Sequence, residues 1–289
     1  MLDRCADIAF SCASSKPRNA DQHRAEEPTL PFFTNDNVRL HYEVHGSGQP
    51  VVLLHGGTVS FEYNYAALGW VQRLSNNGLQ VIGLDFRGHG KSGKPHQAQS
   101  YGTANLAGDV TALLDHLHLE HAALLGYSIG TAVALHLLRF APGRIDKAAL
   151  VATGDGLVGY PPHEFHRILP GLAIAIARAE YPRDLARDVA AYWNFIEATH
   201  GEREALLAFA AGSYPPMSIE DAARIRSAVL VVSGENDRVL GRGPRLAACL
   251  GHGQYLEVAG ADHFSLAADA ATQAAVARFL APESGSGPQ

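Results

Sequence analysis

Short apolar runs alternate with amphipathic stretches along most of this chain. The apolar runs are at 51–54, 79–85, 122–126, 147–153, 228–234 and 254–260. Such runs are typical of strands that are buried on both faces of a sheet. Between two of them, apolar residues from Leu106 to Leu117 recur with the period of an amphipathic helix. This alternation predicts an α/β fold with a mainly parallel sheet and helices on both faces.

The segment before these runs has a different pattern, because apolar and polar residues alternate in VRLHYEV (38–44). The turn signal Gly46-Ser47-Gly48 follows it, which indicates a strand of a hairpin. A helix is predicted from about Tyr65 to Asn77, with Gly78 placed to end it. Thr103 is the expected N-cap of the next helix.

The alternation is lost at both ends of the chain and in one internal stretch. Residues 1–32 mix polar residues without periodicity, and they predict a loose N-terminal extension. Residues 283–289 predict a flexible tail. Residues 155–221 have a largely helical pattern, which predicts a helical lid inserted between two parts of one core, 33–154 and 222–282.

A G-x-S-x-G sequence, Gly126-Tyr127-Ser128-Ile129-Gly130, lies between a buried strand and a helix. In this context the pentapeptide indicates a nucleophile elbow, a sharp turn that presents the serine at the start of the helix. The alternative is a glycine-rich turn with a structural serine. A serine hydroxyl is a weak nucleophile, so a catalytic Ser128 requires a base, and the base requires an acid that orients it.

His263 is the expected base, because it follows the last predicted strand and precedes the terminal helix. Asp237 follows the preceding strand, and the carboxyl ends of parallel strands share one edge of a sheet. The order serine, acid, histidine is that of an α/β hydrolase. Asp155, which follows the strand 147–153, is the main competitor for the acid, and Glu235 is a weaker one. Asp262 is adjacent to the histidine and is expected to be structural or exposed to solvent.

The oxyanion of an acyl-transfer intermediate requires two backbone N–H donors. Ile129, directly after the nucleophile, is expected to supply one. Gly57, in the loop His55-Gly56-Gly57-Thr58, is our first choice for the other and Thr58 our second. Contacts with the substrate are expected from Thr58 and Tyr127 and from two aromatic residues of the lid, Tyr160 and Trp193, for which core packing is the alternative.

The charge distribution argues against several classes of partner. The formal net charge is −6 and Lys and Arg are not clustered, so nucleic acid and anionic membranes are not expected partners. The most apolar internal stretch, Leu172 to Ala177, is too short to span a bilayer. The first residues lack the pattern of a secretory signal, and we expect a cytoplasmic protein. Asp85, Arg87 and His89 lie in a loop at the end of a predicted strand, and they are expected to brace that loop rather than to touch substrate.

Metal binding is not expected either. The three cysteines, Cys5, Cys12 and Cys249, are scattered and are expected to be free thiols. The histidines at 116, 118 and 121 flank a predicted helix end, where histidine interacts favourably with the last carbonyls.

Taken in order, HGG (55–57), DFRGHGKSG (85–93), GYSIG (126–130), SGENDRV (233–239) and GADHF (260–264) resemble the landmarks of the α/β-hydrolase superfamily. The resemblance covers about residues 33–282. It implies a sheet of about eight strands, a lid inserted after the sixth strand, and no metal or organic cofactor.

The sequence departs from the family pattern at two places. Asp262 stands where the family often has glycine before the histidine, and Gly130-Thr131 stands where it often has Gly-Gly, as in cofactor-free haloperoxidases. Ser128 distinguishes the chain from the haloalkane dehalogenases and epoxide hydrolases of the superfamily, whose nucleophile is aspartate.

These features favour a serine hydrolase that cleaves a small to medium, apolar carboxylic ester, with water as the second substrate. A lactonase or a C–C bond hydrolase with the same triad is the nearest alternative. An alternative of another class is a ligand receptor on a hydrolase fold, because fold does not fix function. The oligomeric state is left open.

Overall fold

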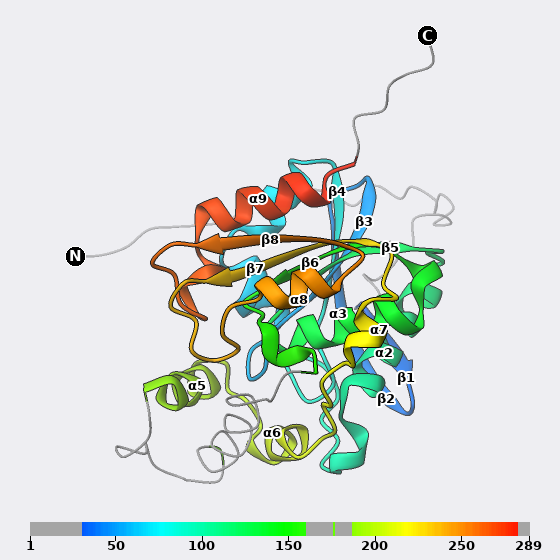
Figure 1. Cartoon of the computed structure of the whole chain (residues 1–289). Coiled ribbons are helices and arrows are strands. Elements are labelled where there is room, and N and C mark those ends of the chain that lie inside the picture. Colours follow the sequence, from blue (N-terminus) through cyan, green and yellow to red (C-terminus); the bar gives the residue numbers. More distant parts are fainter. Residues whose placement is uncertain (1–30, 160–175, 177–186, 283–289) are drawn as a thin grey trace, which may run out of the picture. The chain divides into compact units, whose positions relative to one another are not determined.

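The computed structural model describes residues 31–159, 176 and 187–282, all of them in the second of two units into which the chain divides, 1–30 and 31–289 (Figure 1). The core of this unit is an eight-stranded sheet with the order β1-β2-β4-β3-β5-β6-β7-β8. The strands are β1 (Phe32–Asn35), β2 (Val38–His45), β3 (Gln49–Leu54), β4 (Leu79–Leu84), β5 (Ala122–Tyr127), β6 (Ile145–Val151), β7 (Ala228–Gly234) and β8 (His252–Val258). The pairs β1–β2 and β2–β4 are antiparallel and the other pairs are parallel, so the prediction of a mainly parallel sheet is confirmed.

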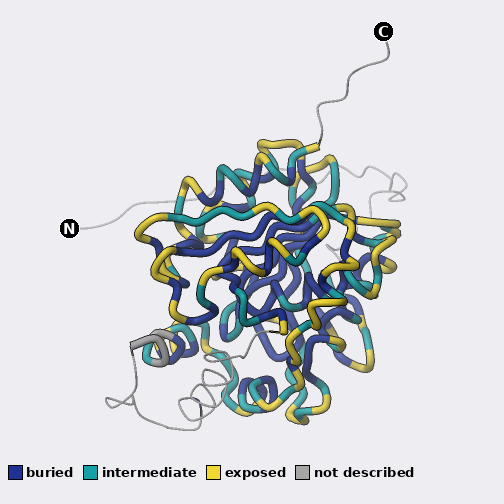
Figure 2. The backbone as a smooth tube through the Cα atoms, viewed as in Figure 1, coloured by how far each residue is buried: buried dark blue, intermediate teal, exposed yellow. Residues whose placement is uncertain are grey.

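Helices cover both faces of the sheet, as predicted. The described helices are α1 (Trp70–Ser75), α2 (Thr103–His116), α3 (Ile129–Phe140), α5 (Arg187–Ala198), α6 (Arg203–Ala210), α7 (Ile219–Ala222), α8 (Pro244–Cys249) and α9 (Ala270–Leu280), with short helical turns η1 (Glu62–Ala66), η2 (Ala98–Ser100), η3 (Pro142–Arg144), η4 (Asp155–Leu157) and η5 (Ser265–Ala267). One apolar cluster joins α2, α3 and α8 to one face, and another joins α1 and α9 to the other. The central strands β3 to β7 are mostly buried, whereas the edge strand β8 is not (Figure 2).

The register of the parallel strands brings their carboxyl ends to one edge. Leu54 pairs with Leu84 on one side and with Gly126 on the other. Further along the sheet, Tyr127 pairs with Val151. In the central strands the large apolar side chains are almost fully buried, which stabilises the fold by about 1.5–3 kcal/mol for each large aliphatic residue. The loops that follow the strands therefore meet on one side of the molecule.

The first hairpin differs from the expectation. β2 pairs with β1, which begins at Phe32 and lies in part within the predicted extension, and not with β3. The connecting residues Asp36 and Asn37 have φ angles of 47° and 61°, values that suit a tight turn between antiparallel strands. The turn at Gly46–Gly48 instead leads β3 to a position between β4 and β5.

Two helix starts also differ. The helix predicted from Tyr65 to Asn77 is divided at Gly69, whose φ of 82° is left-handed, into η1, a π-helical turn, and α1. Thr103 is the first residue of α2 rather than its N-cap, because Gly102 takes the cap position with a φ of 136° that favours glycine.

The segment between β6 and β7 contains η4, α5, α6 and α7 in its described part. Residues 160–175 and 177–186 lie outside the described residues, so the lid over 155–221 stays a prediction. The loose extension and the flexible tail also stay predictions. None of the described helices is both long enough and apolar enough to cross a membrane.

Candidate active site

Ser128 lies in the turn between β5 and α3, with a φ of 53° and a ψ of −118°. This conformation is strained for a residue with a side chain. Glycine on either side makes the turn possible: a Cβ at Gly126 would lie 2.7 Å from the carbonyl oxygen of Gly130, and a Cβ at Gly130 would lie 2.1 Å from that of Leu54. The sequence therefore folds here into a turn that holds the serine hydroxyl at the beginning of a helix.

The structure brings Ser128, His263 and Asp237 together in a line of hydrogen bonds. His263 Nε2 is 3.0 Å from Ser128 Oγ, and His263 Nδ1 is 2.9 Å from Asp237 Oδ2. The other carboxylate oxygen of Asp237 accepts the N–H groups of Val239 and Leu240 at 2.8 and 3.0 Å. All three side chains are buried. The carboxylate is thus fixed by the backbone, and it fixes the ring of the histidine.

The loop that carries His263 is held from two elements. The hydroxyl of Tyr127, the last residue of β5, donates to the carbonyl oxygen of His263. Burial raises the pKa of Tyr127 well above its ordinary value, so the hydroxyl remains a donor. The indole Nε1 of Trp70 donates to the carbonyl oxygen of Ala267 at 2.7 Å. Tyr127, expected to contact substrate, therefore also positions the histidine, and its ring lines the pocket described below.

The competing carboxylates make hydrogen bonds elsewhere. Asp155 Oδ1 accepts the N–H of Leu246 at 2.8 Å in the first turn of α8. Glu235 Oε2 accepts the N–H of Gly260 at 2.8 Å. Asp262 Oδ1 accepts the N–H groups of the two residues after His263 and is exposed. The geometry therefore favours Asp237 as the partner of the histidine.

The loop after β3 is fixed by His55, a residue the sequence did not single out for a role. His55 Nε2 lies 3.0 Å from the N–H of Phe86 and accepts it, so its Nδ1 carries the proton and donates to Gly56 O at 2.7 Å. Burial lowers the pKa of His55 and keeps the ring neutral. In a trans peptide the N–H points opposite to the carbonyl, so the N–H of Gly57 is directed away from His55. No described residue accepts this N–H.

Thr58 differs from the expectation for it. Its N–H, our second choice for the oxyanion, already donates to His89 Nε2 at 3.1 Å. Its carbonyl oxygen accepts the hydroxyl of Thr199 at 3.2 Å, and its side chain is buried with a hydroxyl that has no partner among the described residues. Thr58 does not line the pocket, so neither expected role fits its position. His89, which lies in the loop after β4, thereby holds the loop after β3.

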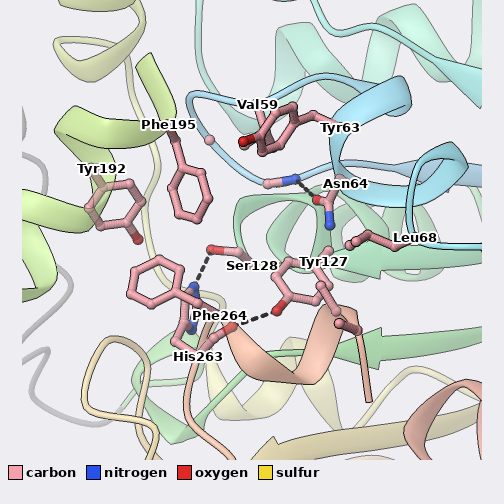
Figure 3. A pocket seen from close by; sticks show the side chains of 14 residues that line it. Val59, Tyr63, Asn64, Leu68, Tyr127, Ser128, Tyr192, Phe195, His263 and Phe264 are labelled. Atoms are coloured by element: carbon pink, nitrogen blue, oxygen red, sulfur yellow. Dashed lines mark hydrogen bonds between the residues drawn. The ribbon is translucent and has the colours of Figure 1, made fainter. Parts of the chain in front are cut away.

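The pocket in front of Ser128 has a volume of about 210 Å³ and opens between the core and α5 (Figure 3). Its lining is mostly apolar and aromatic, and no described residue in it has an Asp, Glu, Lys or Arg side chain. It consists of Gly56, Gly57, Val59, Tyr63, Asn64, Leu68, Tyr127, Ser128, Tyr192, Phe195, His263, Phe264, Ala267 and Ala268. Phe195 and Asn64 had not been predicted for the site.

Of the two aromatic residues predicted for substrate contact, Trp193 is not part of this lining. It is buried, and the guanidinium of Arg203 lies 4.3 Å from the centre of its ring. The residues of α5 that do line the pocket are Tyr192 and Phe195, which lie on either side of Trp193 in the sequence. Tyr160 lies outside the described residues.

Three or more His, Cys, Asp or Glu side chains do not gather into a potential metal site anywhere in the described part of the chain. His116 lies 3.2 Å from the hydroxyl of Tyr42, and His121 pairs with Asp146 at 2.8 Å. Cys249 is a free thiol.

Comparison with known proteins adds an independent observation. The sequence profile described as alpha/beta hydrolase fold matches residues 49–223, more than half of the chain. The AB hydrolase superfamily protein YisY of Bacillus subtilis is 32% identical over 161 residues, which cover 53% of this chain and 57% of that protein. A non-heme haloperoxidase of Rhodococcus erythropolis is 35% identical over 128 residues, or 42% of this chain and 43% of that protein.

Among solved structures, the enol-lactonase from Burkholderia xenovorans LB400 superimposes with a TM-score of 0.69 at 22% identity, covering 87% of this chain and all of the enol-lactonase. This likeness shows a shared fold. The matches to the two sequence relatives span less than two thirds of the length of each.

Proposed function

Because this chain belongs to the family of the α/β hydrolase fold, we propose that it is a serine hydrolase that cleaves a small to medium, apolar carboxylic ester through an acyl-enzyme. The observation that carries the proposal is the line of hydrogen bonds from Asp237 through His263 to Ser128, which ends in the pocket. This arrangement supplies a nucleophile, a base and an orienting acid within hydrogen-bond distance of one another.

In the first half of the proposed reaction, Ser128 Oγ attacks the ester carbonyl as its proton passes to His263 Nε2. The N–H groups of Gly57 and Ile129 stabilise the oxyanion, and each donor of this kind contributes about 3–4 kcal/mol to the transition state. The imidazolium is stabilised by Asp237 and gives its proton to the departing alcohol.

In the second half, water attacks the carbonyl carbon of the acyl group while His263 takes a proton from the water. The tetrahedral intermediate then collapses, and the proton returns to Ser128 Oγ as the carboxylic acid leaves. The apolar lining supports an uncharged acyl chain, because a charged group would lose its hydration there without gaining a partner among the described residues. The cytoplasm remains the proposed location.

A lactone is the second candidate substrate, since it is a cyclic ester open to the same steps. The likeness in fold to an enol-lactonase supports testing it. The experiment is a panel of p-nitrophenyl esters, lactones and β-diketones, with the ester of highest kcat/KM expected to be uncharged. Slow turnover of every compound together with tight binding of one would favour the receptor alternative.

The nucleophile can be tested directly with a fluorophosphonate, because only a serine that is activated beside an oxyanion site reacts readily with it. We expect stoichiometric labelling of Ser128, read by intact mass and peptide mapping, and none in Ser128→Ala. Labelling of another serine, or none in a preparation that hydrolyses esters, would contradict the proposal.

A further inference from the structure

Asn64 is the one amide side chain among the described residues that line the pocket. It belongs to η1 and is only 5% exposed. Its Oδ1 lies 2.8 Å from the N–H of Gly56. A backbone N–H can only donate, so the oxygen of the amide must face Gly56, and the amino group must face the opposite way.

The amino group of Asn64 is therefore a fixed donor. Figure 3 shows it turned away from Gly56 and toward Tyr127 and Leu68. No described residue accepts a hydrogen bond from it. The amino group is not among the fully buried polar atoms that lack a partner, so it is accessible from the pocket, and a ligand oxygen there can accept a hydrogen bond from it. The lining residues around the amino group are otherwise apolar and include Leu68 and Ala267.

Asn64 lies close to the proposed reaction centre. A Cβ built on Gly56 would be 3.5 Å from Asn64 Oδ1 and 3.6 Å from Ser128 Cβ, so the two side chains flank the same glycine. In Figure 3, Asn64 and Leu68 lie on one side of Ser128, and Tyr192 and Phe195 lie on the other.

The direction of the proton transfer indicates on which side of Ser128 each half of the substrate lies. His263 gives its proton to the departing alcohol, and it reaches Ser128 from the side on which Phe264 lies (Figure 3). Under the proposed mechanism, we therefore expect the alcohol to leave on the side of Phe264 and the acyl chain to extend toward Asn64 and Leu68.

We infer that Asn64 determines substrate specificity by donating a hydrogen bond from Nδ2 to an acceptor oxygen in the acyl chain. The substrate class is then an uncharged ester or lactone whose acyl chain carries an ether, keto or hydroxyl oxygen a few atoms from the reacting carbonyl. This inference rests on the proposed ester hydrolysis, and it adds a role to the one that Asn64 Oδ1 has in holding Gly56.

Three esters of equal length test it: p-nitrophenyl pentanoate, ethoxyacetate and 3-methoxypropanoate, which differ only in whether and where an oxygen replaces a methylene. The value of kcat/KM for each is divided by its rate of alkaline hydrolysis, which removes the intrinsic reactivity. We expect the wild-type protein to prefer at least one ether ester by about threefold to tenfold, the gain from one net hydrogen bond.

Two variants test the role of the Asn64 amino group separately from that of its side-chain oxygen. Asn64→Asp keeps an acceptor for Gly56 but has no amino group, and Asn64→Leu has neither. Both are expected to lose the preference for the ether ester. Leu68→Ala is the matched control on the same side of the pocket, expected to change the dependence on chain length and to keep the preference. Thermal melting checks that each variant is folded.

An equal loss of activity on all three esters in the Asn64 variants would mean that the residue only supports the loop, and it would overturn the inference. A wild-type protein with no preference, or a preference that survives Asn64→Asp, would overturn it as well. These outcomes leave ester hydrolysis intact, because the pentanoate ester is still cleaved. If the wild-type protein cleaves none of the three esters, the proposed function fails and the inference fails with it.

Discussion

The two walls of the pocket are built from different interactions. The core wall is formed by η1 and by the loops that follow β3, β5 and β8, and the α5 wall is formed by Tyr192 and Phe195. On the core wall, every group near the proposed reaction centre is held by a directional bond: Asp237 by two backbone N–H groups, His263 by Asp237, and the Gly56 peptide by His55 and Asn64. On the α5 wall, aromatic rings meet: Phe195 lies 5.4 Å from Phe264 and 6.0 Å from Tyr63 between ring centres.

This difference teaches where the chemistry and the selectivity reside. Hydrogen bonds fix atoms to within a few tenths of an ångström, as a transition state requires. Ring contacts fill space with little directional demand and accommodate ligands of different shape. Apart from Asn64, whose amino group is proposed to select the acyl chain, we therefore expect changes in the core wall to act on kcat or on folding, and changes in the α5 wall to act on KM.

The strongest test of the core wall is the acid. Asp237→Asn should lower kcat by about two to four orders of magnitude with little change in substrate binding, because the amide neither enforces the right tautomer of His263 nor stabilises the imidazolium. Asp155→Asn is the matched control, and since its side chain accepts a backbone N–H at the start of α8, it should stay within about threefold of wild type. Steady-state kinetics with one ester at saturation measures both, and a crippled Asp155→Asn beside a normal Asp237→Asn would reverse the assignment.

A second test of the core wall uses acid stability. Burial lowers the pKa of His89 from 6.5 to about 3, so the neutral ring can accept the N–H of Thr58. Between these pKa values the unfolded chain binds a proton that the folded protein excludes. The stability that depends on neutral His89 is therefore complete above pH 6.5 and is lost as the pH falls toward 3.

Urea unfolding across this pH range measures the effect. In His89→Gln, whose side-chain oxygen can still accept a hydrogen bond, the decline of unfolding free energy with falling pH should be shallower by up to about 1.4 kcal/mol per pH unit. His55, with a pKa also lowered by burial, remains in both proteins and keeps some of the slope. Equal slopes in the two proteins would show that His89 is not excluded from protonation.

On the α5 wall, Phe195→Ala should raise KM for an apolar ester by about threefold to tenfold and leave kcat within about twofold, since it removes apolar contact that the ground state and transition state share. Phe140→Ala is the matched control, because Phe140 is 58% exposed and lies outside this pocket. A fall in kcat larger than the rise in KM would show that the α5 wall also positions the reacting atoms.

The smallest effect is expected where the two walls meet. The hydroxyl of Thr199, directly after α5, lies 3.2 Å from the carbonyl oxygen of Thr58 and 2.8 Å from that of Phe195, so its one proton is shared between two acceptors. Thr199→Val should lower kcat by about twofold to threefold, the value of one part-buried neutral hydrogen bond, and Thr199→Ser, which keeps the hydroxyl, should have the wild-type kcat. Equal kcat in all three proteins would show that the core loop keeps its geometry without this bond.

Much of the sheet and the position of the candidate site followed from the sequence, because parallel strands share an edge. Ser128, Asp237 and His263 each lie after one of the predicted strands, and the register of the sheet brings the carboxyl ends of these strands together. Their catalytic roles stay predictions. β1 was missed because it is short and its turn, Asp36-Asn37, lacks the glycine that usually signals a hairpin.

Other features depend on details that the hydrophobic pattern does not carry. Asn64 lies in a π-helical turn, whose extra residue shifts every following side chain, so no helical period indicates that it faces the pocket. For α5, periodicity indicates an apolar face but not which of several aromatic residues lines the pocket, so the prediction of Trp193 missed Tyr192 and Phe195.

Because α5 and α6 lie between β6 and β7 in the chain, the ribosome completes β6 well before it reaches β7. Residues 152–227 separate β6 from β7, so at about 5–20 residues per second the ribosome needs several seconds to pass from one strand to the next. During that interval β6 is an open sheet edge, which is a site for wrong pairing. The nascent chain already holds Ser128 but neither Asp237 nor His263, and under the proposed mechanism it stays inert until the last strands are complete.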